Sequence, residues 1–257
     1  MHALLAQLAS VQGHPPANAE RAVEELTARP EVEIAVFPEL FLSGYDLSLL
    51  DQTALALDCP ELRAVANAAQ VASTAVVVGF AERCAGGSFA NSVACIDADG
   101  SLAGVYRKTQ LFGAERRVFR PGDALRIVRL AGVNVGPLIC FDVEFPEPAR
   151  QLARAGAELL ITASANMDPF VADHEIATRA RALENRVPHL YANAVGTVGS
   201  TRFVGHSRSV AATGDVLSAA ASTEEALLVA PVGTAGTDDE RVDYLRQLRH
   251  DLDVAVG

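Results

Sequence analysis

The strongest constraint on the fold of this chain is the order in which two kinds of segment alternate along it. Short apolar runs rich in β-branched residues, such as EIAVF at 33–37 and TAVVVGF at 74–80, alternate with amphipathic runs. Buried strands give the first pattern and surface helices give the second. The order strand, helix, strand, helix, strand, strand occurs twice, without a residue-level repeat. The sequence therefore predicts an α/β fold.

Turn and cap signals refine this prediction. Segment 91–108 is predicted to be a hairpin turning at Asp99-Gly100, and segment 125–140 a hairpin turning near Ala131-Gly132. Asn18 is predicted to cap the first helix, and Asp58 the helix that begins near Pro60. Two similar halves with hairpins predict two mixed sheets packed face to face, with helices outside. No linker-like tract divides the chain, so we expect a single domain over residues 1–257.

Composition excludes several classes of protein. Hydrophobic residues make up 50% of the 257 residues, enough for a sizeable core, and the net charge of −11 argues against nucleic-acid or anionic-membrane partners. The N-terminus lacks a basic signal region, and no run approaches the ~20 apolar residues of a membrane helix, so we expect a cytoplasmic protein. The four cysteines show no metal-site spacing, and neither a metal nor a cofactor is expected.

Three residues at predicted strand ends suggest chemistry. Glu39 follows a strand that stops at Pro38, Cys140 ends an apolar strand, and Lys108 ends a hairpin arm and is the only lysine in the chain. Each alone has an ordinary explanation: a surface acid, a small buried hydrophobe or a solvated charge. Together they provide a carboxylate, a nucleophile and a compact cation. Cysteine-based hydrolysis of an amide needs this combination.

The segments that carry these residues resemble those of the nitrilase superfamily, the carbon–nitrogen hydrolases with a Glu-Lys-Cys triad. The resemblance covers FPELFLSGY, VYRKTQLFG and GPLICFDVEFPE, and it continues through FGAERRVFRPG, RARALEN and FVGHSRSVAATGDVL. It implies a four-layer α-β-β-α sandwich and a homodimer or higher homo-oligomer. The tail, about 237–257, is expected either to form a surface helix or to pack on a partner subunit.

The resemblance also implies roles for individual residues. Cys140 matches the nucleophile, Glu39 the general base and then acid, and Lys108 the electrostatic stabiliser. Glu115 matches a second glutamate that holds the lysine and orients the substrate. Lys108 and the backbone N–H of Phe141 are the expected oxyanion donors. The planar guanidinium of an arginine would collide with a carbonyl held between Cys140 and Glu39, which explains why a lysine persists at position 108.

The substrate is expected to be a small aliphatic amide. CFDVEFPE, SANMDPF and FGAERRVF resemble the aliphatic amidases that convert 5-aminopentanamide to 5-aminopentanoate and ammonia. A carboxylate at Glu144 suits an amine-bearing or neutral substrate, but it could equally face a subunit contact or pair with an arginine. His174 is either a pocket donor or a helix cap. The candidate substrate-binding residues are Glu144, Asn166, Met167, His174 and Tyr45.

Other functions stay open at this stage. A nitrilase or an N-carbamoyl amine hydrolase would use the same triad. A non-catalytic binding protein could retain the fold, but it would be expected to lose Glu39, Lys108 or Cys140, and all three are present. The sequence contains no G-x-S-x-G, H-E-x-x-H or P-loop motif of the competing chemistries.

Overall fold

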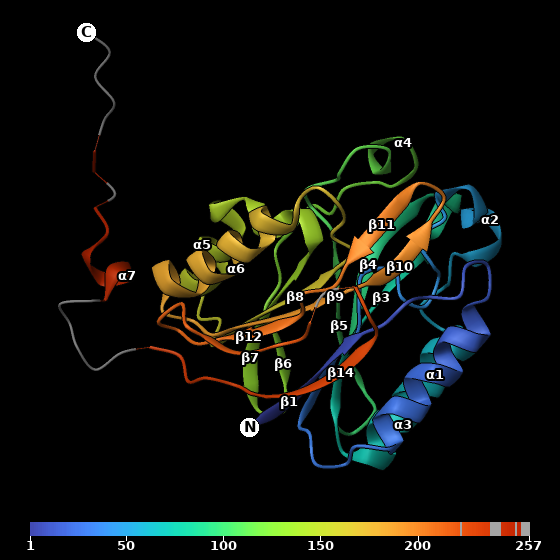
Figure 1. Cartoon of the computed structure of the whole chain (residues 1–257), viewed down its shortest axis with the longest axis horizontal. Coiled ribbons are helices and arrows are strands. Elements are labelled where there is room, and N and C mark those ends of the chain that lie inside the picture. Colours follow the sequence, from blue (N-terminus) through green and yellow to red (C-terminus); the bar gives the residue numbers. More distant parts are fainter. Residues whose placement is uncertain (222, 237–242, 250, 253–257) are drawn as a thin grey trace, which may run out of the picture.

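The computed structural model describes residues 1–221, 223–236, 243–249 and 251–252. Two six-stranded sheets lie face to face, with α1 and α3 outside one sheet and α5 and α6 outside the other (Figure 1). The predicted α-β-β-α sandwich is thus confirmed. Within the described part of the chain, no helix has the length and apolar character needed to cross a membrane.

The first sheet has the order β14-β1-β2-β3-β4-β5. Strands β1, β2 and β3 run parallel, and the outer pairs are antiparallel. The bounds of its strands are β14 (Ala226–Pro231), β1 (His2–Gln7), β2 (Ile34–Val36), β3 (Ala75–Arg83), β4 (Phe89–Ile96) and β5 (Leu102–Arg107). Helices α1 (Pro15–Thr27) and α3 (Pro60–Ala72) pack side by side on its outer face.

The second sheet has the order β13-β12-β9-β8-β7-β6, with β7, β8 and β9 parallel. Its strands are β13 (Val216–Ala219), β12 (Arg208–Val210), β9 (His189–Asn193), β8 (Leu159–Ser164), β7 (Val133–Ile139) and β6 (Val128–Leu130). Helices α5 (Pro146–Arg154) and α6 (Val171–Asn185) cover it.

Shorter elements complete the fold. A separate ribbon pairs β10 (Val195–Val198) with β11 (Thr201–Val204). The short helices are η1 (Leu47–Leu49), α2 (Leu50–Thr53), η2 (Ala85–Gly87), α4 (Glu115–Val118), η3 (Cys140–Glu144) and α7 (Tyr244–Gln247).

The core has separate layers because the central strands are buried on both faces. On β1, Leu5 joins the cluster between the two sheets, whereas Leu4 joins the cluster beneath α1 and α3. Ile139 on β7 faces the first sheet, whereas Leu138 packs under α5. Burial on both faces explains the nearly continuous apolar runs that predicted these strands.

Both predicted hairpins are confirmed, but the helix caps are not where the sequence suggested. Helix α1 begins at Pro15, so Asn18 lies inside it, and its side chain instead bonds the backbone of Val11 and Leu42. Helix α3 is capped by Cys59 and not by Asp58. The Cys59 sulfur accepts from the Leu62 N–H at 3.4 Å. In both cases a proline in the first turn fixes the helix start more strongly than a polar side chain nearby.

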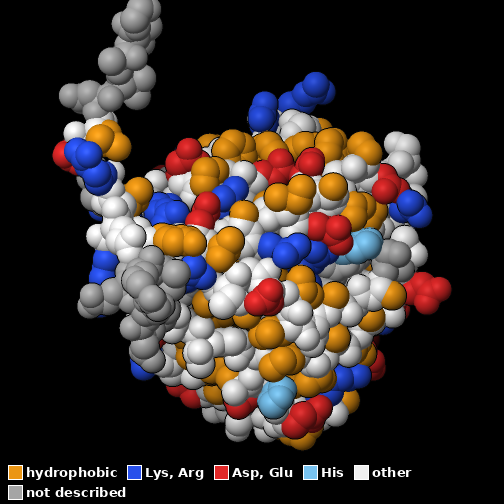
Figure 2. Space-filling model, turned by 60° about the vertical axis from the view of Figure 1, so that its left-hand side comes forward, with side chains coloured by type: hydrophobic (Ala, Val, Ile, Leu, Met, Phe, Trp, Pro, Cys, Tyr) orange, Lys and Arg blue, Asp and Glu red, His pale blue; other side chains and the backbone are white. Residues whose placement is uncertain are grey.

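Part of the C-terminal tail lies outside the described residues, namely 237–242, 250 and 253–257. Within the described part, Tyr244–Gln247 forms α7, and the Arg186 guanidinium lies 4.5 Å from the centre of the Tyr244 ring. Figure 2 shows apolar side chains scattered among charged ones on one face of the molecule. Packing of the tail on a partner, the homo-oligomer and the single domain all stay predictions.

Strand β3 approaches the turn after β2 so closely that one residue must be glycine. A Cβ atom built on Gly79 would lie 2.3 Å from the Pro38 carbonyl oxygen and 2.8 Å from the Glu39 Cα. The Gly79 carbonyl also accepts from the Leu42 N–H at 3.0 Å. The absence of a side chain at position 79 therefore fixes the position of Glu39 against the sheet.

We expect Gly79→Ala to lower the free energy of unfolding by about 3 kcal/mol, because the new methyl group collides with backbone that cannot move aside. Urea unfolding followed by circular dichroism measures this loss. Gly233→Ala is the matched control, since its Cβ would meet no atom closer than 3.4 Å. Equal stabilities of the two variants would contradict the close packing of β3 on the turn.

Candidate active site

The two sheets bring the three strand-end residues of the sequence analysis to one place. Glu39 follows β2 and Lys108 follows β5 in the first sheet, while Cys140 follows β7 in the second. The Lys108 Nζ atom lies 2.6 Å from Glu39 Oε1, and the charges of both residues act on the Cys140 thiol. Residues distant in the sequence thus meet where strands of facing sheets end.

The ammonium of Lys108 lies between two buried carboxylates. Its Nζ atom is 2.6 Å from Glu39 Oε1 and 2.9 Å from Glu115 Oε2, and all three side chains are essentially inaccessible to solvent. Burial alone lowers the pKa of an ammonium, but the charges of Glu39 and Glu115 outweigh it and raise the pKa of Lys108 above its usual value. Lys108 therefore stays protonated.

Two neutral donors complete this cluster. The Asn91 side-chain amide donates to Glu39 Oε1 at 2.7 Å and to Glu115 Oε1 at 3.1 Å. The Tyr45 hydroxyl donates to the same Glu115 oxygen at 2.9 Å. Asn91 is not among the residues predicted from the sequence, although the polar pair Asn91-Ser92 within an apolar strand was a usable signal.

The environment of Glu39 prepares it for proton transfer. Its Oε2 atom accepts from the Ala165 N–H at 3.0 Å, which fixes the carboxylate. Burial raises the pKa of Glu39 to about 7; the charge of Glu115 adds to this effect and that of Lys108 opposes it. A carboxyl with such a pKa can both take up and release a proton near neutral pH.

Cys140 is the first residue of η3, directly after β7, and its backbone is strained. Its φ of 43° lies in the left-handed region, which non-glycine residues rarely adopt and which is common at functional sites. The N–H of Phe141 lies in the first turn of η3, where it has no partner within the helix. Burial and the charge of Glu39 raise the pKa of Cys140, against the opposing effect of Lys108, so the resting group is a thiol.

Asp142 fastens the Cys140 turn to the segment after Lys108. Its buried carboxylate accepts from the Ile139 N–H at 3.0 Å and the Tyr106 hydroxyl at 2.8 Å. It also accepts from the Thr109 hydroxyl at 2.9 Å and the Gln110 N–H at 2.8 Å. Asp142 is not among the residues predicted from the sequence, although an acid two positions after a candidate nucleophile was a usable signal.

Of the predicted substrate-binding residues, one contacts the buried cluster and the others bond to neighbouring segments. Tyr45 contacts the cluster directly, as described above. Glu144 pairs with His174 at 3.1 Å. The Asn166 side chain organises its own loop by bonding the Phe170 carbonyl and the Met167 N–H, and Met167 packs with Phe203. Contact of these residues with a substrate stays a prediction.

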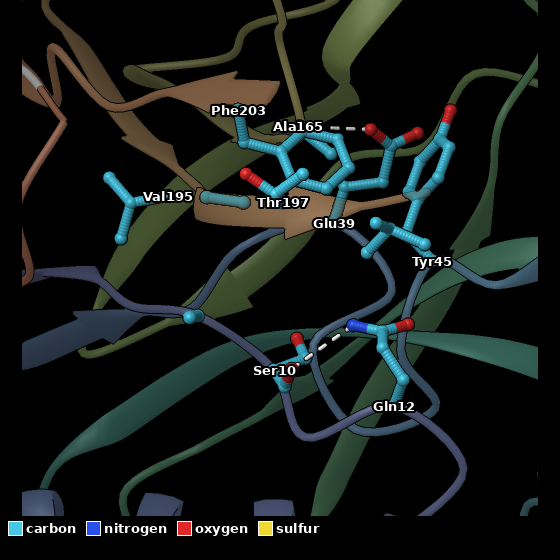
Figure 3. A pocket seen from close by; sticks show the side chains of 11 residues that line it. Ser10, Gln12, Glu39, Tyr45, Ala165, Val195, Thr197 and Phe203 are labelled. Carbon is cyan, nitrogen blue, oxygen red and sulfur yellow. Dashed lines mark hydrogen bonds between the residues drawn. The ribbon is translucent and has the colours of Figure 1, made fainter. Parts of the chain in front are cut away.

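A small cavity adjoins Glu39 (Figure 3). Its volume of about 40 Å³ accommodates only a few water-sized molecules. Ser10 and Gln12 line one side, and residues of the β10–β11 ribbon line another. The Glu39 carboxylate and the Tyr45 hydroxyl point away from Ser10 and Gln12, so the cavity lies against the aliphatic part of the glutamate.

The site thus combines a thiol, a carboxyl that can exchange a proton and a fixed ammonium, and the Phe141 N–H next to the thiol has no partner within its helix. Among the residues that the structure describes, no three His, Cys, Asp or Glu side chains gather where they could hold a metal ion. Such a set can form and cleave a thioester.

A model of the family described as "Carbon-nitrogen hydrolase" matches residues 5–239. The chain belongs to the carbon–nitrogen hydrolase family. It is 37% identical over 252 residues to "(R)-stereoselective amidase" of Pseudomonas sp, covering 97% of this chain and 88% of that protein. It is 41% identical over 216 residues to "Hydrolase in pqqF 5'region" of Pseudomonas protegens, covering 82% and 75%.

Solved structures agree with this assignment to the nitrilase superfamily. The NitN amidase of Nesterenkonia sp. AN1 superposes with a TM-score of 0.86 at 27% identity, covering 97% of this chain and 96% of that one. The chain is therefore a hydrolase of carbon–nitrogen bonds other than peptide bonds. This result stands against a non-catalytic binding protein.

We expect Lys108→Met to cost about 4 kcal/mol of unfolding free energy at about pH 8, because it leaves two carboxylates buried without their counter-charge. Without the ammonium, the folded-state pKa of Glu39 rises further above its unfolded value of 4.5. A carboxyl whose pKa is higher in the folded than in the unfolded protein stabilises the fold at pH values below its unfolded pKa. This stabilisation is lost as the pH rises through its folded pKa. The deficit should therefore shrink at about pH 5.5.

Urea unfolding of both proteins at the two pH values measures this difference. Arg21→Met, which removes a partly exposed pair with Glu225, should cost less than about 1 kcal/mol at either pH. A deficit in Lys108→Met that does not change with pH would argue against an ionised cluster.

Proposed function

We propose that the protein hydrolyses a small aliphatic amide to a carboxylic acid and ammonia, with Cys140 as the nucleophile. The observation that carries this proposal is the buried cluster of Glu39, Lys108 and Glu115 around the end of β7, where Cys140 lies. A structural neighbour provides support: a mutant of the Nesterenkonia amidase shows covalent addition of the acetamide moiety of fluoroacetamide at its active-site cysteine.

Acylation begins when Glu39 takes the proton of the Cys140 thiol and the sulfur attacks the amide carbonyl. Negative charge then develops on the carbonyl oxygen, where the Lys108 ammonium and the Phe141 N–H are the proposed donors. Each donor of this kind contributes about 10²–10³ in rate. The tetrahedral intermediate collapses as Glu39 returns its proton to the departing ammonia, leaving a thioester on Cys140.

Deacylation reuses the same groups. Glu39, again ionised, takes a proton from a water molecule, and the hydroxide attacks the thioester carbonyl. The proton passes from Glu39 to the Cys140 sulfur as the acid leaves. Glu115 keeps the ammonium of Lys108 in place through both steps, and the Asn91 amide keeps the two carboxylates at a fixed separation.

For the substrate, the first candidate is 5-aminopentanamide, on the strength of the CFDVEFPE, SANMDPF and FGAERRVF segments. Glu144 is 29% exposed and has a second oxygen that can accept from an ammonium. The competing candidate is a short neutral amide, since the Nesterenkonia amidase has been solved with butyramide and acrylamide. The pairing of Glu144 with His174 is compatible with either substrate.

Two related reactions are tested beside these. One curated relative is named "Nitrilase", from Pyrococcus abyssi, at 32% identity, and another "N-carbamoylputrescine amidase", from Solanum lycopersicum, at 33%. The triad proposed here could act on a nitrile or a carbamoyl group as well. The amide is preferred because the Nesterenkonia amidase superposes closely on this chain and one relative at 37% identity is named as an amidase.

The deciding experiment measures ammonia release from 5-aminopentanamide and from pentanamide, which differ only in the terminal amine. We expect release from at least one of them, and a loss of more than about 10³-fold in Cys140→Ala, because the nucleophile is gone. Preference for the amine-bearing member supports 5-aminopentanamide, and the reverse preference supports a neutral substrate.

Pentanenitrile and an N-carbamoyl amine complete the panel. Faster Cys140-dependent turnover of either would replace the amide proposal. Cys59→Ala is the matched control, because it removes a half-buried thiol far from the cluster in sequence. Equal losses in both cysteine variants would contradict a nucleophilic role for Cys140.

We expect kcat/KM to fall by about tenfold per pH unit below pH 7, because Glu39, whose pKa is raised to about 7, must be ionised to act as a base. A rate profile between about pH 5 and 9 measures this, with circular dichroism confirming that the fold persists. Glu39→Gln should lose this acid limb together with most of its activity. An unchanged rate at about pH 5.5 would count against Glu39 as the base.

A further inference from the structure

A chain of hydrogen bonds runs from Ser164, whose hydroxyl influences the Cys140 thiol, to the surface and takes no part in the mechanism above. The Ser164 hydroxyl acts on the Cys140 thiol, whose pKa it lowers, and lies 3.0 Å from the Tyr191 hydroxyl. The Tyr191 hydroxyl lies 2.8 Å from His174 Nδ1, and His174 Nε2 lies 3.1 Å from Glu144 Oε1. We call Ser164, Tyr191, His174 and Glu144 the relay.

The members of the relay come from different elements and are mostly shielded from water. Ser164 ends β8, Tyr191 lies on β9 and His174 on α6, and each is at most 2% exposed. Only Glu144, in η3, reaches solvent, with 29% of its side chain exposed. Buried polar groups must find partners within the protein, so the hydrogen-bond directions in the relay depend on one another.

The chemistry of the end groups sets those directions in the resting enzyme. A carboxylate can only accept, so His174 Nε2 carries a hydrogen toward Glu144. Burial lowers the pKa of His174, and its neutral Nδ1 then accepts from the Tyr191 hydroxyl. The Tyr191 oxygen accepts from Ser164, and the Ser164 oxygen accepts from the Cys140 S–H. All the hydrogens point from the thiol toward Glu144.

Formation of the thiolate reverses this order. Once Glu39 has taken the thiol proton, the Cys140 sulfur can only accept, so the Ser164 hydroxyl turns to it and the Tyr191 hydroxyl turns to Ser164. His174 Nδ1 then faces an oxygen lone pair, unless it binds a proton. The imidazolium donates to Tyr191 on one side and to Glu144 on the other, and its proton comes from solvent at the Glu144 end.

We propose that the relay positions the Cys140 sulfur and links its ionisation to uptake of one proton by His174, with Glu144 as the counter-charge. Ser164, Tyr191 and His174 are positioning residues, since they act on the substrate only through Cys140. The proposal rests on the nucleophilic role of Cys140 given above. It also gives Glu144 a function that does not require contact with the substrate.

Other charged and titratable groups face the thiol or the relay and stay unchanged in the test variants. They are Glu39, Lys108, Asp173, Arg181, His189 and Arg208. Differences between wild type and relay variants therefore report the relay and not these neighbours.

The test compares Tyr191→Phe, His174→Gln and the double variant with wild type. We expect Tyr191→Phe to lower kcat by about tenfold, the rate equivalent of one buried hydrogen bond, with KM within about twofold. The double variant should be no slower than the slower single variant, because either change cuts the same chain. Thr162→Val is the matched control: its hydroxyl is also buried on β8 and bonds a histidine, His189, at 2.7 Å.

A second readout needs no substrate. The rate at which Cys140 reacts with methyl methanethiosulfonate is followed between about pH 5.5 and 8.5, with Cys140→Ser as the blank for Cys59 and Cys84. In wild type, we expect the plot of reaction rate against pH to show a step caused by titration of His174. The step should be missing from Tyr191→Phe and His174→Gln and present in Thr162→Val. If Tyr191→Phe does not fold, Ser164→Ala replaces it with the same expected outcomes.

Two results would overturn the relay. The first is an effect of the double variant equal to the product of the single effects. The second is a thiol profile in Tyr191→Phe that matches that of Thr162→Val. Failure of the amide panel alongside the expected thiol profiles would count against the proposed substrate, and not against the relay.

Discussion

The site depends on one buried ammonium. Glu39 and Glu115 could not both lie ionised in the interior without Lys108 between them, because like charges repel strongly where water is excluded. The ammonium therefore has a structural task before any chemical one. It also explains why arginine is unsuitable at position 108: a planar guanidinium would need more space than two carboxylates and an entering carbonyl leave.

The sandwich architecture keeps this cluster rigid. One sheet supplies the carboxylate and the ammonium, the other supplies the thiol, and the apolar layer between the sheets fixes their separation. Two local contacts further fix the positions of the site residues. Gly79 lets β3 press against the Glu39 turn, and Asp142 fastens the Cys140 turn to the backbone that follows Lys108. The candidate site is thus built from residues at strand ends and not from long loops.

The sequence predicted the layers well, because apolar runs of strand length are a local signal. The residues of the proposed triad also have a local signal, as polar residues where those runs stop, and their catalytic roles stay predictions. Glu115 came only from family resemblance, since nothing local distinguishes it from a surface acid. Asn91 and Tyr191 were missed because their roles come from partners distant in the chain; Asn91 is 52 residues from Glu39. The wrong cap at Asn18 has the same cause, as tertiary contacts with Val11 and Leu42 claim its side chain. Strand β14 was missed too, although ALLVAP is an apolar run of strand length; its partner β1 lies at the opposite end of the chain.

The charge balance of the buried cluster has a consequence for turnover. With both carboxylates ionised, Glu39 and Glu115 outnumber the single ammonium, so the interior beside Cys140 carries an excess negative charge. A neutral amide enters such a site without electrostatic cost. The acid formed from it ionises once free, and the resulting anion is repelled by the surroundings that accepted its precursor. The same arrangement of charges thus favours departure of an acid product and disfavours its return.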